Sequence, residues 1–238
     1  MGSAIVKKLS IQGAKVIIHY NHREEVANSI MTEIKNIGGT AGVLRADVTN
    51  EKEVQALLRE TIKRFGAINI IVNTVHGNSD AKLVTNMNWI DWDVHLEALK
   101  GHFYICKNVL PYMERQNYGR IVYISGGLSY RFFKGHSAYS TIKAGLNAFC
   151  KTMVLEEGEH NITVNIVAPG KVISKGAGES NYNPNVLEDI AREEMSKSPL
   201  KRFATADDVA NAVLYFVSPE ASCITGQTLF VTGGEIIP

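Results

Sequence analysis

Six short segments rich in β-branched residues recur along this chain of 238 residues, and a stretch with helical spacing precedes each of them. Several segments are apolar almost without interruption, which is typical of parallel strands covered by helices on both faces. Strands that alternate with helices in this way specify an α/β fold with right-handed crossovers. The expected strands cover residues 15–20, 42–48, 68–75, 120–125, 163–168 and 228–232. The expected helices cover residues 3–11, 23–37, 51–65, 89–114, 137–157 and 206–217.

The composition excludes several classes of protein. Lys and Arg total 25 against 24 Asp and Glu, so the net charge of +1 gives no electrostatic case for binding nucleic acid or anionic lipid. No apolar run approaches the roughly 18 residues of a membrane span, and residues 1–9 lack the apolar region of a signal peptide. The three cysteines are far apart and lack metal-ligand spacing. We therefore expect a cytoplasmic protein with no metal site and no nucleic-acid or membrane partner.

Residues 171–199 break the regular alternation. This segment contains two glycines, two prolines and a short polar helix expected near residues 186–197. A long excursion after the end of a strand usually covers a ligand, so we expect a substrate lid here. Because no linker-like shift in composition occurs elsewhere, we expect a single domain over residues 1–238.

Tyr139 and Lys143 carry the most specific chemistry in the sequence. They stand four residues apart in an expected helix, so their side chains share one face. A lysine cation near a phenol favours the phenolate, and we expect it to lower the pKa of Tyr139 below its usual value of about 10. A tyrosine with such a pKa is a better proton donor or acceptor near neutral pH.

With Tyr139 and Lys143 on a helix that follows the expected strand at 120–125, the chain resembles the short-chain dehydrogenase/reductase family, and most closely its 3-oxoacyl-acyl-carrier-protein reductases. The resemblance covers essentially the whole chain and implies a Rossmann-type doubly wound parallel sheet. It also implies NAD(P)-dependent reduction of a carbonyl or oxidation of a secondary alcohol, with Tyr139 as acid/base and Lys143 assisting. The motifs in family order are Gly13-Ala14-Lys15-Val16, Ala46-Asp47-Val48-Thr49, Val72-Asn73, Ser137 to Gly145, Asn165 to Gly170, Ile224 to Gln227 and Val231 to Gly234.

The resemblance also implies which residues hold the cofactor. Members that prefer NAD carry an acidic residue at the end of the second family strand, where this chain has Tyr20. Arg23 can pair with a 2′-phosphate there, although a solvated arginine at a helix start explains it equally well. We therefore expect NADP, and NAD stays possible. The implied cofactor-binding residues are Gly2, Tyr20, Asn21, Arg23, Asp47, Val48, Asn73, Tyr139, Lys143, Pro169, Gly170 and Val172.

The amino terminus departs from the family pattern. Family members open with a strand and a Thr-Gly-x-x-x-Gly-x-Gly turn, whereas this chain begins at Met1 and matches only the last glycine, Gly2. We expect the chain to be shortened relative to a natural protein. The alternative is a naturally truncated protein, in which the sheet must reorganise because its central strand is missing, and which should bind a dinucleotide poorly.

The catalytic tetrad of the family is degenerate in this chain. Counting back thirteen residues from Tyr139 places Gly126 where the family has a serine, so Ser125 or Ser129 would have to replace that hydroxyl. Ser125 is the replacement we name as catalytic. Ala98 stands where the family has an asparagine that contacts the lysine in a proton relay.

Further departures leave two functions open. The family's Asn-Asn-Ala-Gly reads Asn73 to His76 here, and His76 and His136 are candidate replacements near the site. The first hypothesis is an NADP-dependent reductase acting on a small carbonyl or alcohol substrate. The second is a catalytically impaired member that binds a ligand or serves as a partner subunit. The resemblance further implies a homotetramer formed through the long helix near Trp89, the Tyr-Lys helix and the last strand.

Overall fold

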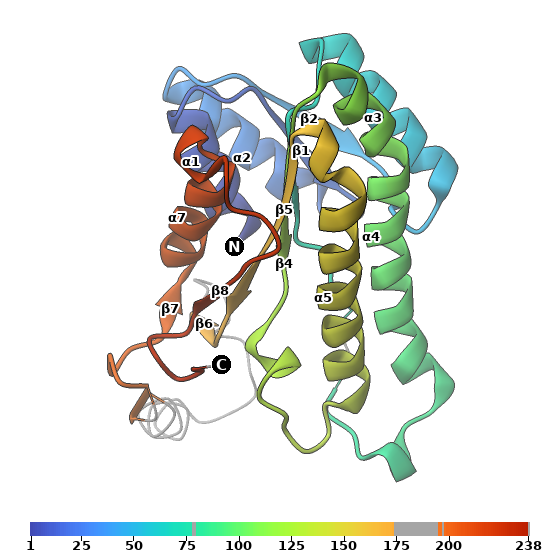
Figure 1. The fold of residues 1–238 in the computed structure, drawn as a ribbon, viewed down its shortest axis with the longest axis vertical. Helices are drawn as coiled ribbons and strands as arrows, with labels where there is room; N and C mark the ends of the chain where they lie inside the picture. Colours follow the sequence, from blue (N-terminus) through green and yellow to red (C-terminus); the bar gives the residue numbers. More distant parts are fainter. Residues whose placement is uncertain (78–79, 174–194, 197, 238) are drawn as a thin grey trace.

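The computed structural model describes residues 1–77, 80–173, 195–196 and 198–237, and it consists of parallel strands between two layers of helices (Figure 1). The predicted α/β class is confirmed, and the predicted elements agree with the observed ones to within three residues at each end. The strands are β1 (Val16–Tyr20), β2 (Ala41–Arg45), β3 (Ile70–Asn73), β4 (Gly119–Ile124), β5 (Ile162–Pro169), β6 (Val172–Ile173), β7 (Ala204–Thr205) and β8 (Thr228–Val231). The helices are α1 (Gly2–Ile11), α2 (Glu24–Asn36), α3 (Glu51–Phe65), α4 (Trp89–Gln116), α5 (Ser137–Glu157) and α7 (Ala206–Val217). Short 3₁₀ turns occupy Val84–Asn86, Gly127–Ser129, Gly158–His160 and Pro219–Ala221.

Local capping explains where two of the helices begin. The Asn88 side chain accepts a hydrogen bond from the backbone N–H of Asp91, and the Asp91 carboxylate accepts one from Asn88, which fixes the start of α4. Thr205 and Asp208 form the same reciprocal arrangement at the start of α7. Two of the N–H groups that a helix leaves unpaired at its amino end are satisfied in each case.

The parallel sheet is divided into two parts. Strand β1 pairs only with β2, whereas the larger part has the order β3-β4-β5-β8, and in the described residues no ladder joins β1 to β3. The first strand of the family would lie between these two edges. The remaining strands keep their order, and within the described residues they form two separate parallel sheets instead of one continuous sheet.

Two cores cover the two faces of the strands. Helices α1, α2 and α7 lie on one face, and their apolar side chains pack with those of β1, β4 and β5. Helices α3, α4 and α5 lie on the other face and pack against β4 and β5 from that side. Strands β4 and β5 are buried along their whole length, whereas most residues of β1 and β3 are half-buried. The best-covered part of the molecule is therefore the β4–β5 centre.

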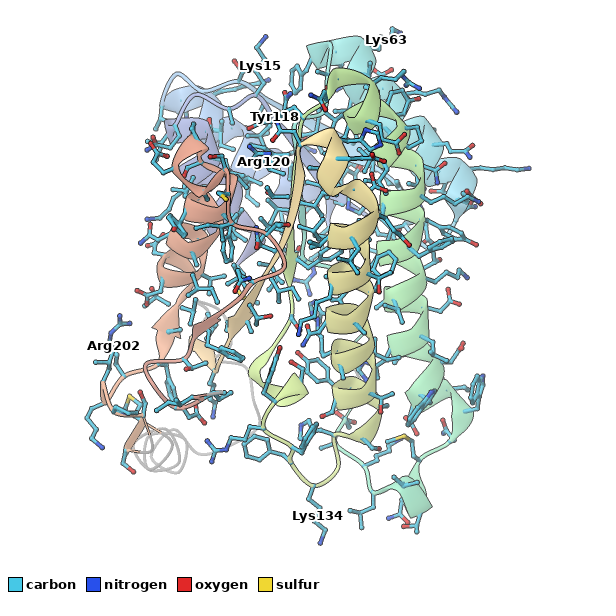
Figure 2. The ribbon with its side chains drawn as sticks, in the orientation of Figure 1. Lys15, Lys63, Tyr118, Arg120, Lys134 and Arg202 are labelled. Carbon is cyan, nitrogen blue, oxygen red and sulfur yellow. The ribbon has the colours of Figure 1, made fainter. Side chains whose placement is uncertain are left out.

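The two ends of the sheet differ in character. Tyr118 and Arg120 lie at the end where β4 begins, and Lys134 lies at the opposite end, just before α5 (Figure 2). The buried Arg120 guanidinium stacks on the Tyr118 ring at 4.3 Å and donates hydrogen bonds to the Gly119 and Asn161 carbonyls. Its Nη1 donors are thus used within the protein, whereas its buried Nε has no partner among the described residues. Ligands of open α/β sheets bind outside the carboxyl ends of the strands, which is the end marked by Lys134.

None of the helices in the described ranges is long and apolar enough to cross a membrane. The expected lid at 171–199 falls mostly on residues 174–194 and 197, outside the described residues, and so does most of its predicted helix at 186–197.

Candidate active site

Tyr139 and Lys143 lie on one face of α5, next to the carboxyl end of β4. The Lys143 ammonium is 5.6 Å from the centre of the Tyr139 ring, so the pairing expected from their spacing is present. The ammonium donates a hydrogen bond of 3.1 Å to the carbonyl of Ile124, the last residue of β4. Lys143 is only 6% exposed, and this backbone bond anchors its buried charge.

The pKa expected for Tyr139 is wrong for this geometry. Burial raises the pKa of the phenol above 10, and burial lowers the pKa of Lys143 to about 8. The physical reason is that both groups are withdrawn from water and the lysine ammonium bonds the Ile124 carbonyl rather than the phenol oxygen. At neutral pH the pair therefore consists of a neutral tyrosine and a lysine that is still mostly protonated.

Gly126 faces the phenol of Tyr139. A Cβ atom at Gly126 would lie 2.7 Å from the Tyr139 hydroxyl oxygen, which places this residue opposite the acid, where the sequence count put it. The backbone of Gly126 is extended, with φ −167°, so its conformation suits any residue. The side-chain chemistry at this position is missing because of residue type and not because of backbone shape.

Neither serine proposed as a substitute is hydrogen-bonded to Tyr139 within the described residues. The Ser125 hydroxyl donates to the Asn147 side-chain oxygen at 3.0 Å. The Ser129 hydroxyl donates to the Gly126 carbonyl at 2.8 Å and accepts from the Asn147 amide at 3.1 Å. Both hydroxyls belong to a buried network around Asn147.

Helix α4 contributes two histidines that the sequence reasoning missed. The His95 ring meets the Tyr139 ring edge-on, with 5.8 Å between centroids, and Ala98 and His102 follow along the same helix face. Burial lowers the pKa of His95, and the nearby Lys143 and His76 charges lower it further. A signal was present in the sequence, since positions 95, 98 and 102 have the i, i+3, i+7 spacing of one helix face around the Ala98 position.

The two histidines named from the sequence lie in less enclosed places. His76 is exposed on the segment after β3, with its Nδ1 3.2 Å from the Thr74 carbonyl. The Nδ1 atom of His136, at the start of α5, is 3.2 Å from the Lys134 carbonyl. His76 nevertheless lines a small cavity that it shares with His95, His102, Tyr139 and Lys143.

The residues predicted to hold the central part of a cofactor converge at the end of β3. Asn73 is buried, and its side-chain oxygen accepts from the Val75 backbone at 3.1 Å, whereas its Nδ2 donor has no partner among the described residues. Helix α1 begins beside this point, since a Cβ at Gly2 would lie 3.9 Å from the Thr74 hydroxyl. No side chain caps the start of α1. An unpaired buried amide and an uncapped helix terminus suit an anionic, hydrogen-bonding ligand.

The residues predicted for the adenosine end lie at the carboxyl ends of β1 and β2. The Asp47 carboxylate accepts from the Thr49 backbone at 2.9 Å and from its hydroxyl at 2.8 Å, which lowers the pKa of Asp47. Arg45, which the sequence reasoning did not single out, donates to the Asn21 carbonyl at 3.3 Å. Tyr20 ends β1, Val48 is buried, and Arg23 is exposed just before α2. Two arginines therefore flank the segment after β1.

The remaining predicted residues follow β5. Pro169 is the last residue of that strand, and the Gly170 backbone donates to the Val231 carbonyl at 3.1 Å. Val172 lies in β6, where it pairs with Ala204 of β7. These contacts bring the chain after β5 to the carboxyl edge of the sheet, near the end of β8.

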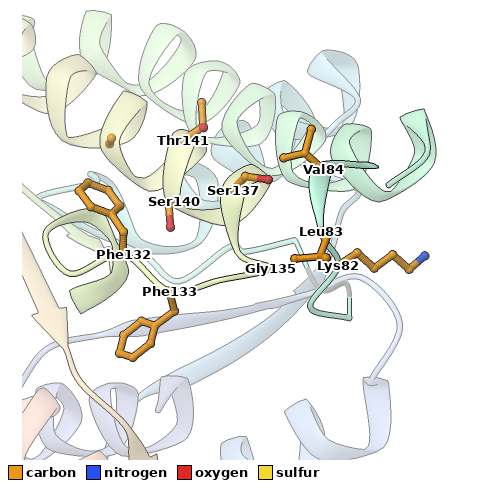
Figure 3. A pocket seen from close by; sticks show the side chains of 10 residues that line it. Lys82, Leu83, Val84, Phe132, Phe133, Gly135, Ser137, Ser140 and Thr141 are labelled. Atoms are coloured by element: carbon orange, nitrogen blue, oxygen red, sulfur yellow. The ribbon is translucent and has the colours of Figure 1, made fainter. Parts of the chain in front are cut away.

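A larger pocket of about 580 Å³ lies on a different face of α5 (Figure 3). Ser140 and Thr141 line it from the helix, and Leu83, Val84 and Phe132 form most of its apolar wall. Tyr139 and Lys143 are not among its lining residues. This pocket is therefore distinct from the site around the phenol.

A family model described as enoyl-(acyl carrier protein) reductase matches residues 1–235. The chain belongs to the short-chain dehydrogenase/reductase family. A 3-oxoacyl-[acyl-carrier-protein] reductase of Staphylococcus epidermidis is 32% identical over 236 residues, covering 98% of this chain and 93% of that protein. The corresponding reductase of Aquifex aeolicus is 34% identical, with 98% and 92% of the two chains covered. The solved structure of a Serratia marcescens short-chain dehydrogenase/reductase superposes with a TM-score of 0.87 at 26% identity, covering 98% of this chain and 92% of that one.

These comparisons confirm the recognised family and its Rossmann-type fold. At this level the chain is a short-chain dehydrogenase/reductase oxidoreductase, similar to the 3-oxoacyl-acyl-carrier-protein reductases.

Proposed function

We propose that this protein is an NADP-dependent carbonyl reductase of the 3-oxoacyl-acyl-carrier-protein type. The observation that carries the proposal is the pairing of half-buried Tyr139 with buried Lys143 at the carboxyl edge of the sheet. A phenol whose ring centre lies 5.6 Å from an ammonium suits transfer of a proton to a substrate oxygen. The names of two similar proteins give the substrate class.

Each residue of the pair has a distinct role in the proposal. Tyr139 gives its phenolic proton to the substrate oxygen during reduction and takes one back during oxidation of an alcohol. Lys143 provides a positive charge that stabilises the phenolate left behind. The nicotinamide cofactor, when bound, supplies or accepts the hydride. The Ser125 hydroxyl donates to the Asn147 side chain, so it would have to give up that bond to serve as the donor to the substrate oxygen.

The described residues fit a phosphorylated dinucleotide. The unpaired Nδ2 of Asn73 and the open start of α1 can receive a ribose and a phosphate, and Asp47 with Val48 can receive the adenine. Arg23 and Arg45 supply positive charge near Tyr20, where no carboxylate ends the strand. Arginine pairs well with phosphate oxygens, which favours NADP over NAD. Gly170, Pro169 and Val172 would then also contact the cofactor, as the family resemblance implies.

The missing side chains at Gly126 and Ala98 favour a second candidate, a binding or partner subunit with little catalysis. Loss of one donor to a developing oxyanion costs about 100-fold to 1,000-fold in rate. The fluorescence of NADPH on addition of the protein, followed by turnover on a 3-oxoacyl thioester, an enoyl thioester and a simple ketone, separates the candidates. NADPH binding with ketone or 3-oxoacyl turnover supports the reductase. Binding without turnover supports the second candidate, and turnover of the enoyl thioester alone would contradict the proposed reaction.

We also propose that the protein assembles as a homotetramer. Helices α4 and α5 lie side by side and present exposed apolar residues, among them Phe103 at 46% and Leu155 at 85% exposure. Small exposed residues, including Gly145 and Ala148, allow a second helix pair to approach closely. A twofold interface formed by the same surface of two copies would cover these residues.

A further inference from the structure

His102 has one satisfied and one unsatisfied ring nitrogen. It is 2% exposed on α4, and its Nε2 lies 3.1 Å from the Val75 carbonyl oxygen. A carbonyl only accepts hydrogen bonds, so Nε2 carries the proton, and the neutral ring leaves Nδ1 with a bare lone pair. That Nδ1 atom is buried and has no hydrogen-bond partner among the described residues. An unpaired buried acceptor is costly, which calls for a partner donor.

Lys143 offers unused donors at the same place. Its ammonium has three protons, and within the described chain a hydrogen bond is seen only to the Ile124 carbonyl. Both Lys143 and His102 line one small cavity of about 10 Å³. Burial lowers the pKa of His102, and the Lys143 charge lowers it further.

The cavity exists because residue 98 is small. Ala98 lies on α4 one turn from both His95 and His102, and its methyl group leaves space that a longer side chain would fill. A cavity holds one water only if the space open to the centre of the water molecule is about 10–15 Å³ or more. Its walls must also supply polar partners. The space beside Ala98 is at this lower limit, and its walls carry both an acceptor and a donor.

We propose that one water molecule occupies this cavity, donating a hydrogen bond to His102 Nδ1 and accepting one from Lys143 Nζ. His102 is thereby a positioning residue for Lys143, and it restores through water a polar contact that Ala98 cannot make. Only the effect of His102 on catalysis rests on the proposed function. The presence of the water is argued from the unpaired Nδ1 of His102 and the unused donors of Lys143. The other titratable side chains facing this space are His76 after β3, His95 on α4 and Tyr139 on α5, and Cys150 lies near Lys143 on α5.

A crystal structure that resolves bound water tests the first part. We expect a density peak within hydrogen-bonding distance of both His102 Nδ1 and Lys143 Nζ. In Ala98→Ser the new hydroxyl should displace that water and take over its contacts. A wild-type cavity without density, in a map that shows other buried waters, would overturn the proposal.

Titration of Lys143 by NMR of its side-chain nitrogen tests the link between the two residues. In His102→Leu the water loses the acceptor that holds it beside the Lys143 ammonium. The charged form of Lys143 is then less well stabilised, so its pKa should fall further below about 8. In His102→Gln an amide oxygen can accept from the water, so the pKa should stay closer to that of the wild type. An unchanged Lys143 pKa in a folded His102→Leu protein would contradict the role of His102. Neither experiment requires turnover, so failure here is distinguishable from failure of the proposed reaction.

Discussion

Lys143 illustrates how a residue proposed to act in catalysis can lower stability. Its side chain is almost fully buried and donates a hydrogen bond to the Ile124 carbonyl, and burial lowers its pKa from 10.5 to about 8. The folded pKa lies below the unfolded one, so the unfolded chain binds more protons between these two pH values. Stability therefore rises with pH across this range, and the cost of burying the charge is fully present below pH 8.

Lys143→Met should stabilise the protein at pH 7. The pKa difference corresponds to at most about 3 kcal/mol, and the lost hydrogen bond to Ile124 offsets about 1 kcal/mol of it, so we expect a gain of about 1–2 kcal/mol. The gain should shrink as the pH rises toward 10. Urea unfolding of the variant and the wild type at pH 7 and pH 9.5 measures it. Lys151→Met removes an exposed lysine of the same helix and is the matched control for losing a charge without burial.

Tyr139→Phe should abolish carbonyl reduction while leaving NADPH affinity and folding nearly unchanged. The substitution removes only the phenolic oxygen and keeps the ring that packs against His95. Steady-state turnover, NADPH titration and circular dichroism give the three readouts. Turnover retained at the wild-type rate would mean that another group, such as His95, supplies the proton.

Gly126→Ser should raise turnover on a simple ketone by roughly tenfold to 100-fold, because it adds a donor opposite the phenol. The extended backbone at this position tolerates the side chain, and the end of the Tyr139 ring must shift to make room for the new Cβ. Gly126→Ala brings the same Cβ without the hydroxyl and should not raise turnover. Equal rates in the two variants would show that residue 126 does not contact the substrate oxygen.

The sequence predicted some of these residues and missed others for physical reasons. Tyr139 and Lys143 were singled out because four-residue spacing places side chains on one helix face, and Gly126 because the family's serine lies thirteen residues before the tyrosine. His102 was missed, since its bond to the Val75 carbonyl and the cavity that it shares with Lys143 join residues distant in sequence. The pKa of Tyr139 was predicted in the wrong direction because burial cannot be read from spacing.

At the scale of elements, apolar periodicity predicted six strands and six helices closely, but it missed the two-residue strands β6 and β7, which are too short to show a period. The capping side chains of α4 and α7 lie at their predicted starts. Periodicity does not specify which strands pair, however. The division between β1 and β3 falls where the family resemblance places the missing first strand, so it came from the resemblance and not from periodicity.

Backbone amides of β1 and β2 should exchange with solvent faster than those of β4 and β5. The first pair is half-buried and has hydrogen bonds only within itself in the described chain, whereas β4 is paired on both sides and fully buried. Local opening of the smaller pair therefore breaks fewer contacts. Hydrogen exchange followed by mass spectrometry compares the two regions. Equal protection in both would show that the two parts unfold as one unit.

At the scale of the whole molecule, the exposed face of α4 and α5 determines the expected assembly. Ala148→Glu places a charge in the centre of this face and should convert tetramers into smaller species at micromolar concentration, as measured by light scattering. Ser29→Glu, on an exposed position of α2, should leave the assembly unchanged. A wild-type protein that is already monomeric would contradict the homotetramer.

The divided sheet also bears on how the molecule behaves when heated. The inner borders of β1 and β3 carry backbone donors and acceptors that no strand of the described chain pairs. Such borders are templates onto which an extended segment of another molecule can add. Partial opening of the described chain at these borders would favour intermolecular strand addition and irreversible precipitation. The temperature at which the protein stays in solution would then be limited by aggregation before its best-packed strands unfold.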